Sequence, residues 1–359
     1  MKTFYINNLE DLGQHHQAAF AQSEAISFDL SFPWFANFID TALKPNERVR
    51  ICVSENDNGQ VVLLPMCFEE GTSKPRTIRS LVSCYTAFFA PIGSGSNNVE
   101  LLTLALSTLK RDTPSWDVIN FMPLDGSKAY FSALKKALSA IGMLPYGYCC
   151  FGNWYLPVAG RSYAEYHQTL PSRLKNTIKR KRSHFFSNDA GKLDIVMGGD
   201  QLEQVIAAYQ KVYSTSWKVQ EPFPEFIPGL IRLSAEQGWL RLGIAYLHGE
   251  PIAAQIWIVA HRRASIFKLA YDEKYASCSA GSILSAHMME YVLDVDKVEE
   301  VDYLSGDDPY KKDWMSHRRE RWGIIAYNPG TIWGFWGVLK QSLVWLRRML
   351  LLYSNRKTS

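Results

Sequence analysis

Apolar residues in the second half of the chain first form short runs and then recur at helical spacing. Three apolar runs, at 242–247, 252–260 and 265–271, are separated by the polar segments 248–251 and 261–263. Short apolar runs that are bounded by turn residues predict antiparallel strands joined by tight turns. The pattern therefore predicts a three-stranded antiparallel unit.

A polar loop at 272–281 follows the third predicted strand. From Ile283 to Val292, apolar residues then recur at the spacing of one face of a helix. The remaining predicted elements are a buried strand at 298–305, a short helix at 309–314 and a last strand at 322–327. The predicted order is strand, strand, strand, loop, helix, strand, helix, strand.

The first half of the chain repeats this order, roughly 190 residues earlier and without useful residue identity. A hairpin is predicted around 56–59, because Asn and Gly accept the positive φ that such turns need. A third strand is predicted at 78–89, followed by a Gly- and Ser-containing loop at 91–96. The later elements are a helix at 101–109, a strand at 116–121, a helix at 130–141 and a strand at 146–156.

The order of elements in the second half resembles the core of the GNAT acyltransferases. Three segments carry a closer resemblance, namely Tyr271–Asp272, Ser279–Ser282 and Asp302–Lys311. They look like the branch of that superfamily found near bacterial cellulose and exopolysaccharide synthesis, which is related to the Fem-type aminoacyl-transferases of peptidoglycan. The close resemblance covers residues 171–327.

This resemblance, together with the repeated order, indicates an α/β (α+β) fold with two tandem GNAT-like domains. Each domain is expected to be a mixed, mostly antiparallel sheet flanked by helices. We predict an N-terminal GNAT-like domain at 1–160, a GNAT-like acyltransferase domain at 161–330 and a basic amphipathic C-terminal helix at 331–359.

A helix N-terminus is the predicted binding site for the pyrophosphate of an acyl-CoA. Ser279, Ala280, Gly281 and Ser282 lie where the polar loop enters the predicted helix, and Ala280 and Gly281 carry no bulk. Free backbone N–H groups at a helix N-terminus bind anions, aided by the helix dipole. The alternative is that these residues only cap the helix.

The resemblance also implies that the strands at 265–271 and 301–305 diverge, so that the thioester enters between them. Backbone N–H groups near Ala270 and Tyr271 would then stabilise the oxyanion. No catalytic cysteine and no Ser-His-Asp order is evident in the sequence, so direct attack on the thioester is favoured over an acyl-enzyme.

Carboxylates and tyrosines around this gap are the candidate catalytic residues. Asp302 lies in the second diverging strand, and Asp307 is the candidate general base. Asp307 and Lys311 are four residues apart on the predicted short helix and are expected to face each other, with Lys311 holding an acceptor oxygen. Tyr271 or Tyr310 would return a proton to the leaving thiolate. The alternative is that Asp307 caps the helix and Lys311 pairs with it.

A basic segment lies between the predicted domains. Leu170, Leu174 and Ile178 form one narrow apolar stripe, and the cations occupy the remaining positions. These cations are Arg173, Lys175, Lys179, Arg180, Lys181 and Arg182. The segment is either a solvated helix face or an electropositive surface for a polyanion, for which Arg180 is a candidate ligand. Farther on, a Pro every few residues at 221–228 predicts a loop beside the acceptor or a linker.

Composition limits the function classes. The chain has 359 residues, 47% hydrophobic and 21% charged, with a net charge of +4 that does not by itself indicate nucleic acid. The six cysteines lack metal-ligand spacing, so we predict reduced cysteines and no metal. The N-terminus lacks a secretory-signal pattern and no membrane-spanning run occurs, which favours a cytoplasmic protein.

The C-terminal segment is apolar on one side and basic elsewhere. From Ile332 to Tyr353, apolar residues recur at alternating spacings of four and three, with Trp333 and Trp345 widening the apolar face. Such a helix suits the inner face of a membrane, where cations meet anionic lipid. It would equally suit packing on the protein body or on a second copy.

The resulting prediction is an acyl-CoA-dependent N-acyltransferase, using acetyl-CoA or another acyl-CoA. The resemblance implies an amine or amino-sugar intermediate of cell-envelope or exopolysaccharide biosynthesis as acceptor. One alternative is a Fem-like aminoacyl-transferase using charged tRNA, which would explain the basic segment. Another is a non-catalytic, membrane-associated scaffold with a GNAT fold.

Overall fold

The computed structural model describes residues 1–71, 74–187 and 190–343 and divides the chain into two compact units. The first unit comprises Met1–Ile39, Leu43–Cys150 and Glu320–Ser359. The second unit comprises Asp40–Ala42 and Phe151–Arg319. The chain therefore passes from one unit to the other within two of its strands, β6 (Leu144–Pro157) and β12 (His317–Tyr327).

The first unit is built on a mixed sheet with the strand order β1-β2-β3-β4-β5-β12. Its other strands are β1 (Lys2–Ile6), β2 (Glu47–Glu55), β3 (Val61–Glu69), β4 (Thr77–Ser80) and β5 (Val118–Asp125). Neighbours pair antiparallel except β4 and β5, which are parallel. The predicted hairpin is confirmed, because β2 and β3 pair from Glu47–Glu69 to Glu55–Val61.

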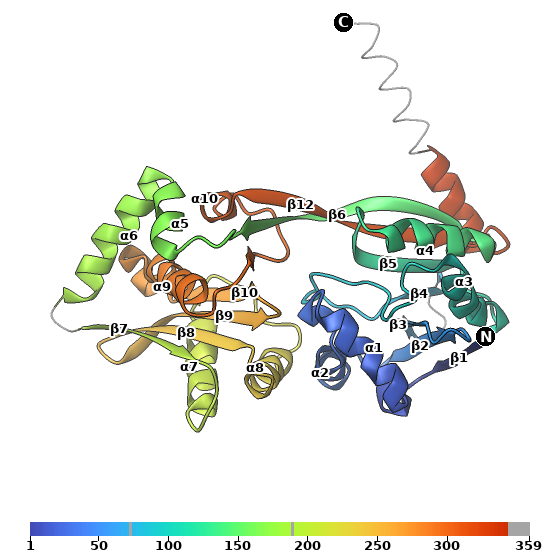
Figure 1. The fold of residues 1–359 in the computed structure, drawn as a ribbon, viewed down its shortest axis with the longest axis horizontal. Coiled ribbons are helices and arrows are strands. Elements are labelled where there is room, and N and C mark those ends of the chain that lie inside the picture. The colour runs from blue at the N-terminus through green and yellow to red at the C-terminus, as the bar shows by residue number, and fades with distance from the viewer. Residues whose placement is uncertain (72–73, 188–189, 344–359) are drawn as a thin grey trace, which may run out of the picture. The chain divides into compact units, whose positions relative to one another are not determined.

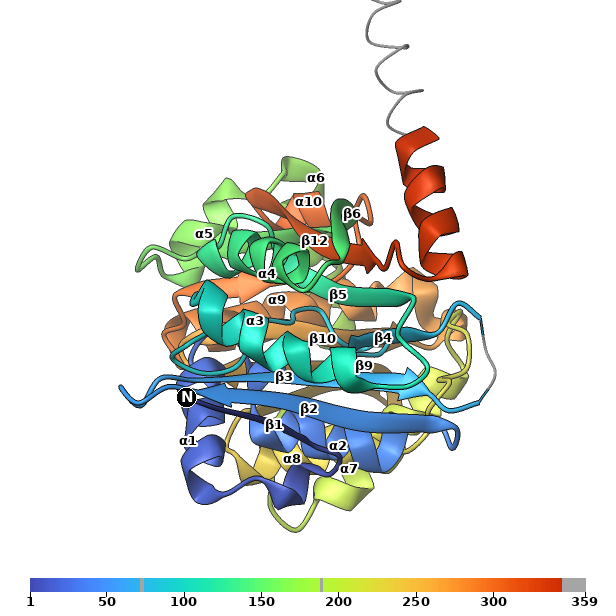
Figure 2. The same ribbon diagram turned by 90° about the vertical axis from the view of Figure 1, so that its right-hand side faces the viewer.

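Helices cover both faces of this sheet. Figure 2 shows α3 and α4 on one face and α1 and α2 on the other. Their bounds are α1 (Gln14–Glu24), α2 (Phe32–Ala42), α3 (Val99–Ser107) and α4 (Ala129–Ala140), with short 3-10 turns η1 (Leu9–Asp11), η2 (Phe28–Leu30) and η3 (Thr108–Arg111). The sequence indicates why α3 begins where it does, since Asn98 accepts hydrogen bonds from the amides of Glu100 and Leu101.

The second unit has the strand order β6-β11-β10-β9-β8-β7. Its remaining strands are β7 (Gly191–Val196), β8 (Leu240–Leu247), β9 (Glu250–Ala260), β10 (Arg263–Tyr271) and β11 (Glu300–Asp302). β10 and β11 are parallel, whereas β6 with β11, β10 with β9, β9 with β8 and β8 with β7 pair antiparallel. Among the described residues, the strands of both units belong to one continuous mixed, mostly antiparallel sheet flanked by helices, which confirms the predicted fold class.

The helices of the second unit lie on the two faces of its sheet, with α5, α6 and α9 on one face and α7 and α8 on the other (Figure 1). Their bounds are α5 (Tyr163–Thr169), α6 (Ser172–Phe185), α7 (Leu202–Ser214), α8 (Phe226–Glu236), α9 (Ala280–Asp294) and α10 (Lys311–Trp314), with the 3-10 segment η5 (Glu273–Cys278). The apolar stripe predicted for α9 packs on the sheet, because Ile283, Leu284 and Met288 are fully buried.

Several elements differ from the sequence prediction. β7 lacked a strong enough pattern to be predicted, because it is a half-buried strand at the end of the sheet order. β11 is shorter than the predicted strand at 298–305, and α8 begins at Phe226, inside the predicted loop at 221–228. Pro228 lies in the first turn of α8, where its missing N–H has no helical acceptor to lose.

The units also divide the chain differently from the predicted domain boundaries. Residues 151–160 group with the second unit rather than the first, and residues 320–330 group with the first. The reason is strand pairing, because β12 pairs with β5 from Arg321 to Tyr327 while β6 pairs with β11 at Tyr155–Pro157.

The helix predicted at 331–359 is described from 332 to 343, and its remaining residues lie outside the described part of the chain. Its large apolar side chains are exposed, including Trp333 at 48% and Trp336 at 62%. Over this stretch, the apolar face does not pack on the protein body. Among the described residues, no helix is both long and apolar enough to cross a bilayer.

The packing of the loop at 91–96 can be tested at Gly93, with Gly142, which lies outside the loop, as the comparison. Gly93 has a φ of +100°, and a Cβ there would lie 2.5 Å from the carbonyl oxygen of Val61. Gly142 has a φ of +85° but has no atom within 4 Å of a Cβ position. We expect Gly142→Ala to cost about 1 kcal/mol of unfolding free energy from backbone strain, and Gly93→Ala about 3 kcal/mol or more. Urea denaturation measures both, and equal losses would contradict the close packing at Gly93.

Candidate active site

β10 has a free edge over the second half of its length. On one side it pairs with β9 as far as Tyr271. On the other side its ladder with β11 consists of three pairs, the last being Ser265 with Asp302. Beyond Ser265, within the described residues, no strand pairs with this edge of β10. The second of the two strands that were expected to diverge, 301–305, is a strand only as far as Asp302, and its early end leaves this edge of β10 open.

A buried carboxylate ends β11. Asp302 is 2% exposed and accepts hydrogen bonds from the amide of Leu304 at 2.7 Å and from Asn153 Nδ2 at 2.5 Å. Asn153 Nδ2 also donates to the carbonyl oxygen of Leu304 at 2.7 Å. These bonds hold Leu304 at a φ of +55°, a left-handed conformation that a strand cannot adopt. The chain therefore turns away from β10 directly after Asp302.

Two arginines complete this cluster. Arg319 forms ion pairs with Asp302 and, at 2.9 Å, with Glu300, which also pairs with Arg263 at 2.9 Å. Burial alone would lower the pKa of Arg319, but the charges of Asp302 and Glu300 raise it overall. Asp302 was a predicted catalytic residue. Its burial and its partners fit a residue that positions the strand end rather than one that reaches a substrate.

The N-terminal turn of α9 lies beside the free end of β10. Ser279 has a φ of 55°, and its carbonyl oxygen accepts the amides of Ser282 and Ile283 at 3.0 and 3.1 Å. Within the described part of the chain, no acceptor is found for the amides of Ala280 and Gly281. A Cβ on Gly281 would lie 3.5 Å from the ring of Tyr271, which is the last residue of β10. The predicted pyrophosphate-binding turn and the predicted oxyanion strand are thus neighbours.

A buried glutamine fixes this turn to the sheet. Gln255 of β9 is fully buried, and its Nε2 donates to the carbonyl oxygen of Gly281 at 2.9 Å and to Ser285 Oγ at 2.8 Å. Its Oε1 accepts from Trp257 Nε1 at 2.9 Å. Gln255 was not among the predicted site residues. Its polar side chain interrupts the apolar run 252–260, which could have indicated a buried hydrogen-bonding role.

The basic segment forms α6 and packs as its stripe predicts. Leu170 and Ile178 are buried, and Leu174 packs against the same core. Lys181 donates to the carbonyl oxygen of Ser277, so the end of α6 lies beside the segment that leads into α9. Arg180, the candidate anion ligand, is exposed.

Asp307 does not have the partner that the sequence predicted. It precedes α10, and its carboxylate binds Arg318 through two hydrogen bonds of 3.0 and 2.7 Å. It also accepts from Trp154 Nε1 at 2.6 Å. The hydrogen bonds from Arg318, and then from Trp154, lower the pKa of Asp307. These contacts reduce its affinity for a proton and suit a carboxylate that orients Arg318.

Lys311 turns inward, away from Asp307. It is 5% exposed, and its Nζ donates to the carbonyl oxygens of Ser305 at 2.6 Å and Gly306 at 3.3 Å and pairs with Asp308 at 3.2 Å. Burial is the main cause that lowers the pKa of Lys311. The expected Asp307–Lys311 pair was wrong because the helix begins only at Lys311, so the two residues do not share a helix face.

Two tyrosines at the site differ in environment. Partial burial raises the pKa of Tyr310 to about 12, so its hydroxyl stays protonated at neutral pH and can donate a hydrogen bond, but it is a weaker acid than a free tyrosine. The ring of Tyr310 lies edge-on to Tyr303, with centroids 5.8 Å apart. The ring of Tyr271 packs on Trp217, with centroids 4.5 Å apart. The segment after α7 therefore lies against the free end of β10.

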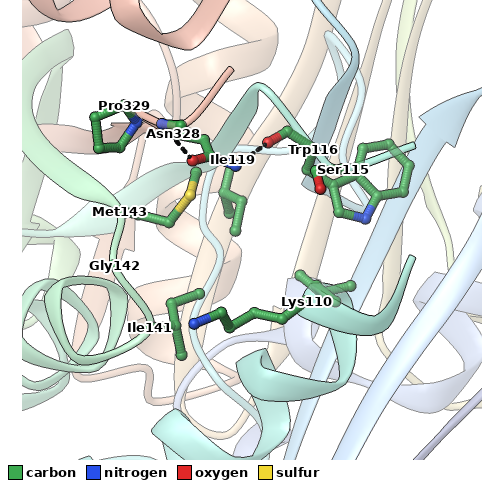
Figure 3. Close-up of a pocket in the computed structure, with 11 residues that line it drawn as sticks. Lys110, Ser115, Trp116, Ile119, Ile141, Gly142, Met143, Asn328 and Pro329 are labelled. Carbon is green, nitrogen blue, oxygen red and sulfur yellow. Dashed lines mark hydrogen bonds between the residues drawn. The ribbon is translucent and has the colours of Figure 1, made fainter. Parts of the chain in front are cut away.

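A separate pocket in the first unit offers less chemistry. Its volume is about 250 Å³, and Figure 3 shows Lys110, Trp116, Ile141 and Met143 around it. Asn328 closes one side by donating to the carbonyl oxygen of Trp116 at 3.0 Å. Lys110 is the one charged side chain among its described lining residues, so this pocket lacks the paired polar groups that group transfer requires.

Comparison with protein families and solved structures agrees with this geometry. Residues 172–312 match the family model described as "Acetyltransferase (GNAT) domain". The second unit contains a GNAT acyltransferase domain. The chain accordingly carries the domain of an N-acyltransferase enzyme. The comparison with curated proteins found no match.

Among solved structures, the crystal structure of FemX is similar to this chain, with a TM-score of 0.61 and 12% identity. The alignment covers 91% of this chain and 97% of the FemX chain. The C-terminal domain of a putative lysylphosphatidylglycerol synthetase from Agrobacterium fabrum has a TM-score of 0.50 and 11% identity, covering 79% of this chain and 86% of that one. A conserved protein from Bacteroides thetaiotaomicron has a TM-score of 0.54 and 12% identity, covering 91% and 99%. At these identities, the likeness shows the fold.

The buried pair at the end of β11 can be tested against an exposed pair nearby. Arg319→Ala leaves the Asp302 carboxylate buried without its main cation, and we expect it to lower the unfolding free energy by about 3 kcal/mol. Arg262 and Glu299 form a pair of which both side chains are 66% exposed, so Arg262→Ala should cost less than about 1 kcal/mol. Urea denaturation of both variants would refute the proposed role of the cluster if the two losses were equal.

Proposed function

We propose that the chain is an acyl-CoA-dependent N-acyltransferase in which the amine attacks the thioester directly. The observation that carries this proposal is that an open strand edge lies next to the backbone amides at a helix N-terminus. Within the described part of the chain, β10 has no strand partner on the β11 side from Ile266 to Tyr271, and this stretch lies next to the amides of Ala280 and Gly281. An acyl-CoA could place its pyrophosphate at the helix and its thioester along the strand.

The proposed reaction forms one bond and breaks one. The amine nitrogen attacks the thioester carbonyl carbon, the C–N bond forms, and the C–S bond breaks. N–H groups near Ala270 and Tyr271 stabilise the oxyanion of the tetrahedral adduct. Tyr310 donates a hydrogen bond to the leaving thiolate, which takes its proton from solvent. The amine proton leaves to solvent, since Arg318 and Trp154 lower the pKa of Asp307.

The proposed acceptor is an amine or amino sugar of cell-envelope or exopolysaccharide biosynthesis, as the resemblance of 271–311 to that branch suggests. Likeness to FemX keeps a Fem-like aminoacyl-transferase using charged tRNA as the second candidate. The exposed cations of α6 favour that candidate, because RNA phosphates would compensate their charge.

We also propose that the exposed apolar face of the helix at 332–343 contacts an anionic membrane surface. Trp333 and Trp336 are exposed on it, Lys340 is a cation on the same helix, and the sequence continues with Arg347 and Arg348. Tryptophan rings suit the depth of lipid headgroups, and cations attract anionic lipid.

The pyrophosphate site is tested by placing a charge on the first turn of α9. Gly281→Asp adds a carboxylate that favours the helix N-terminus but repels a pyrophosphate, whereas Gly281→Asn adds a similar volume without charge. We expect calorimetry to show acetyl-CoA binding at least about tenfold weaker for Gly281→Asp than for Gly281→Asn.

Equal affinities for the two variants would exclude the helix N-terminus as the pyrophosphate site. Absence of acetyl-CoA binding to the unaltered protein, together with binding of aminoacyl-tRNA that falls steeply with salt, would replace the proposal by the Fem-like alternative.

Membrane contact is measured by sedimentation with vesicles. We expect the protein to sediment with vesicles containing phosphatidylglycerol more than with pure phosphatidylcholine, and Trp336→Ser to lose most of this binding. Gln341→Ser alters the opposite side of the helix and serves as the control. A dimer that depends on Trp336, with no vesicle binding, would show instead that the face meets a second copy.

A further inference from the structure

A second pocket of the GNAT-containing unit lies beside the candidate active site. It has a volume of about 380 Å³ and is lined by residues of α7, of the segment that follows α7, and of α8. Tyr213, Ile227 and Pro228 supply apolar walls, while Lys218 and Glu221 supply charges. Its size and mixed lining are those of a site for a small molecule.

Three contacts connect the segment after α7 to the free end of β10 and to the start of η5. The amide of Glu273 donates to the carbonyl oxygen of Thr215 at 3.4 Å, and Trp217 packs on Tyr271. Lys268 of β10 pairs with Glu221 at 2.7 Å. The pocket is therefore held alongside the part of β10 where the thioester is proposed to lie.

Of three lysines at or near this pocket, two form ion pairs and one does not. Lys268 is compensated by Glu221, and Lys311 by Asp308 at 3.2 Å. The ammonium group of Lys218 has no hydrogen bond and no ion pair with any described residue. This ammonium group lies 5.8 Å from the centroid of the Trp217 ring, and the side chain of Lys218 is half-buried. A cation in this position attracts an anion more strongly than an exposed lysine does, because the surrounding dielectric is lower.

Burial and the neighbouring charge of Lys268 lower the pKa of Lys218 to about 8, with Glu221 acting in the opposite direction. Lys311 and Asp308 are the other charged groups that act on it. Lys218 is thus charged below about pH 8 and becomes neutral above it. An anion bound to its ammonium group would raise this pKa, since the charged form gains a partner.

We propose that this pocket holds the acceptor, and that Lys218 binds an anionic group of that acceptor, a carboxylate or a phosphate. The inference rests on the proposed acyl transfer, because it places the acceptor against the thioester edge of β10. The class of substrate is then a small amine with one negative group. Lys218 binds and orients this group, while the amine faces β10.

The test observes Lys218 directly. All lysines are labelled by reductive methylation with ¹³C, and Lys218→Met assigns the Lys218 resonance. Inorganic phosphate and acetate are then titrated in. We expect the Lys218 resonance to move in a saturable way and its pKa to rise, whereas the exposed Lys211, paired with Glu250, should not respond. No movement at Lys218, or an equal movement at Lys211, would overturn the proposal.

A second titration separates the acceptor from the co-substrate. Saturating acetyl-CoA should leave the phosphate response of Lys218 in place, whereas loss of the response would assign Lys218 to coenzyme A and overturn the acceptor site. Glucosamine 6-phosphate should bind at least about tenfold more tightly than glucosamine, and Lys218→Met should remove this difference while Lys211→Met keeps it. If acetyl-CoA fails to bind in calorimetry, the acyl-transfer proposal fails independently of these responses.

Discussion

The arrangement of the candidate site depends on a carboxylate that has no access to water. Burying Asp302 is costly unless its charge is paired and its oxygens are hydrogen-bonded. Arg319, Asn153 and the amide of Leu304 meet both requirements, but only with the backbone of Leu304 turned into the left-handed region. The same bonds that compensate the charge therefore end β11 and leave the edge of β10 open. The open edge of β10, where we propose that the thioester binds, therefore follows from electrostatics at one residue.

Local spacing in the sequence was sufficient for most of the fold. The apolar runs at 242–260 became β8 and β9, and the stripe through Leu174 and Ile178 became the packed face of α6. These patterns repeat over a few residues, so neighbouring positions reinforce one another. The end of β11 was different, because it depends on Asn153 and Arg319, which are far from Asp302 along the chain. No local pattern contains that information.

The charge pairings of the candidate site differ from those that the sequence spacing predicted. Asp307 and Lys311 were expected to meet because they are four residues apart, yet each found a partner that satisfies its charge better. Lys218 attracted no attention in the sequence, since a lone lysine in a loop is common. Only its position against Trp217, between cations that already have partners, distinguishes it from other lysines. Lys268 and Lys311 thus form ion pairs within the fold, whereas the ammonium group of Lys218 is the one that we propose for ligand binding.

The two crossings of the chain within β6 and β12 also affect how the protein is made. Apart from residues 40–42, the second unit is one continuous segment, 151–319. The first unit begins at the N-terminus, but its β5 receives β12 as a neighbour only when residues 320–327 have been synthesised. In the strand order, β12 lies between β5 and β6, so on a ribosome both of these strands keep an open edge until β12 has been synthesised. The placement of a single late strand therefore delays completion of the sheet in both units.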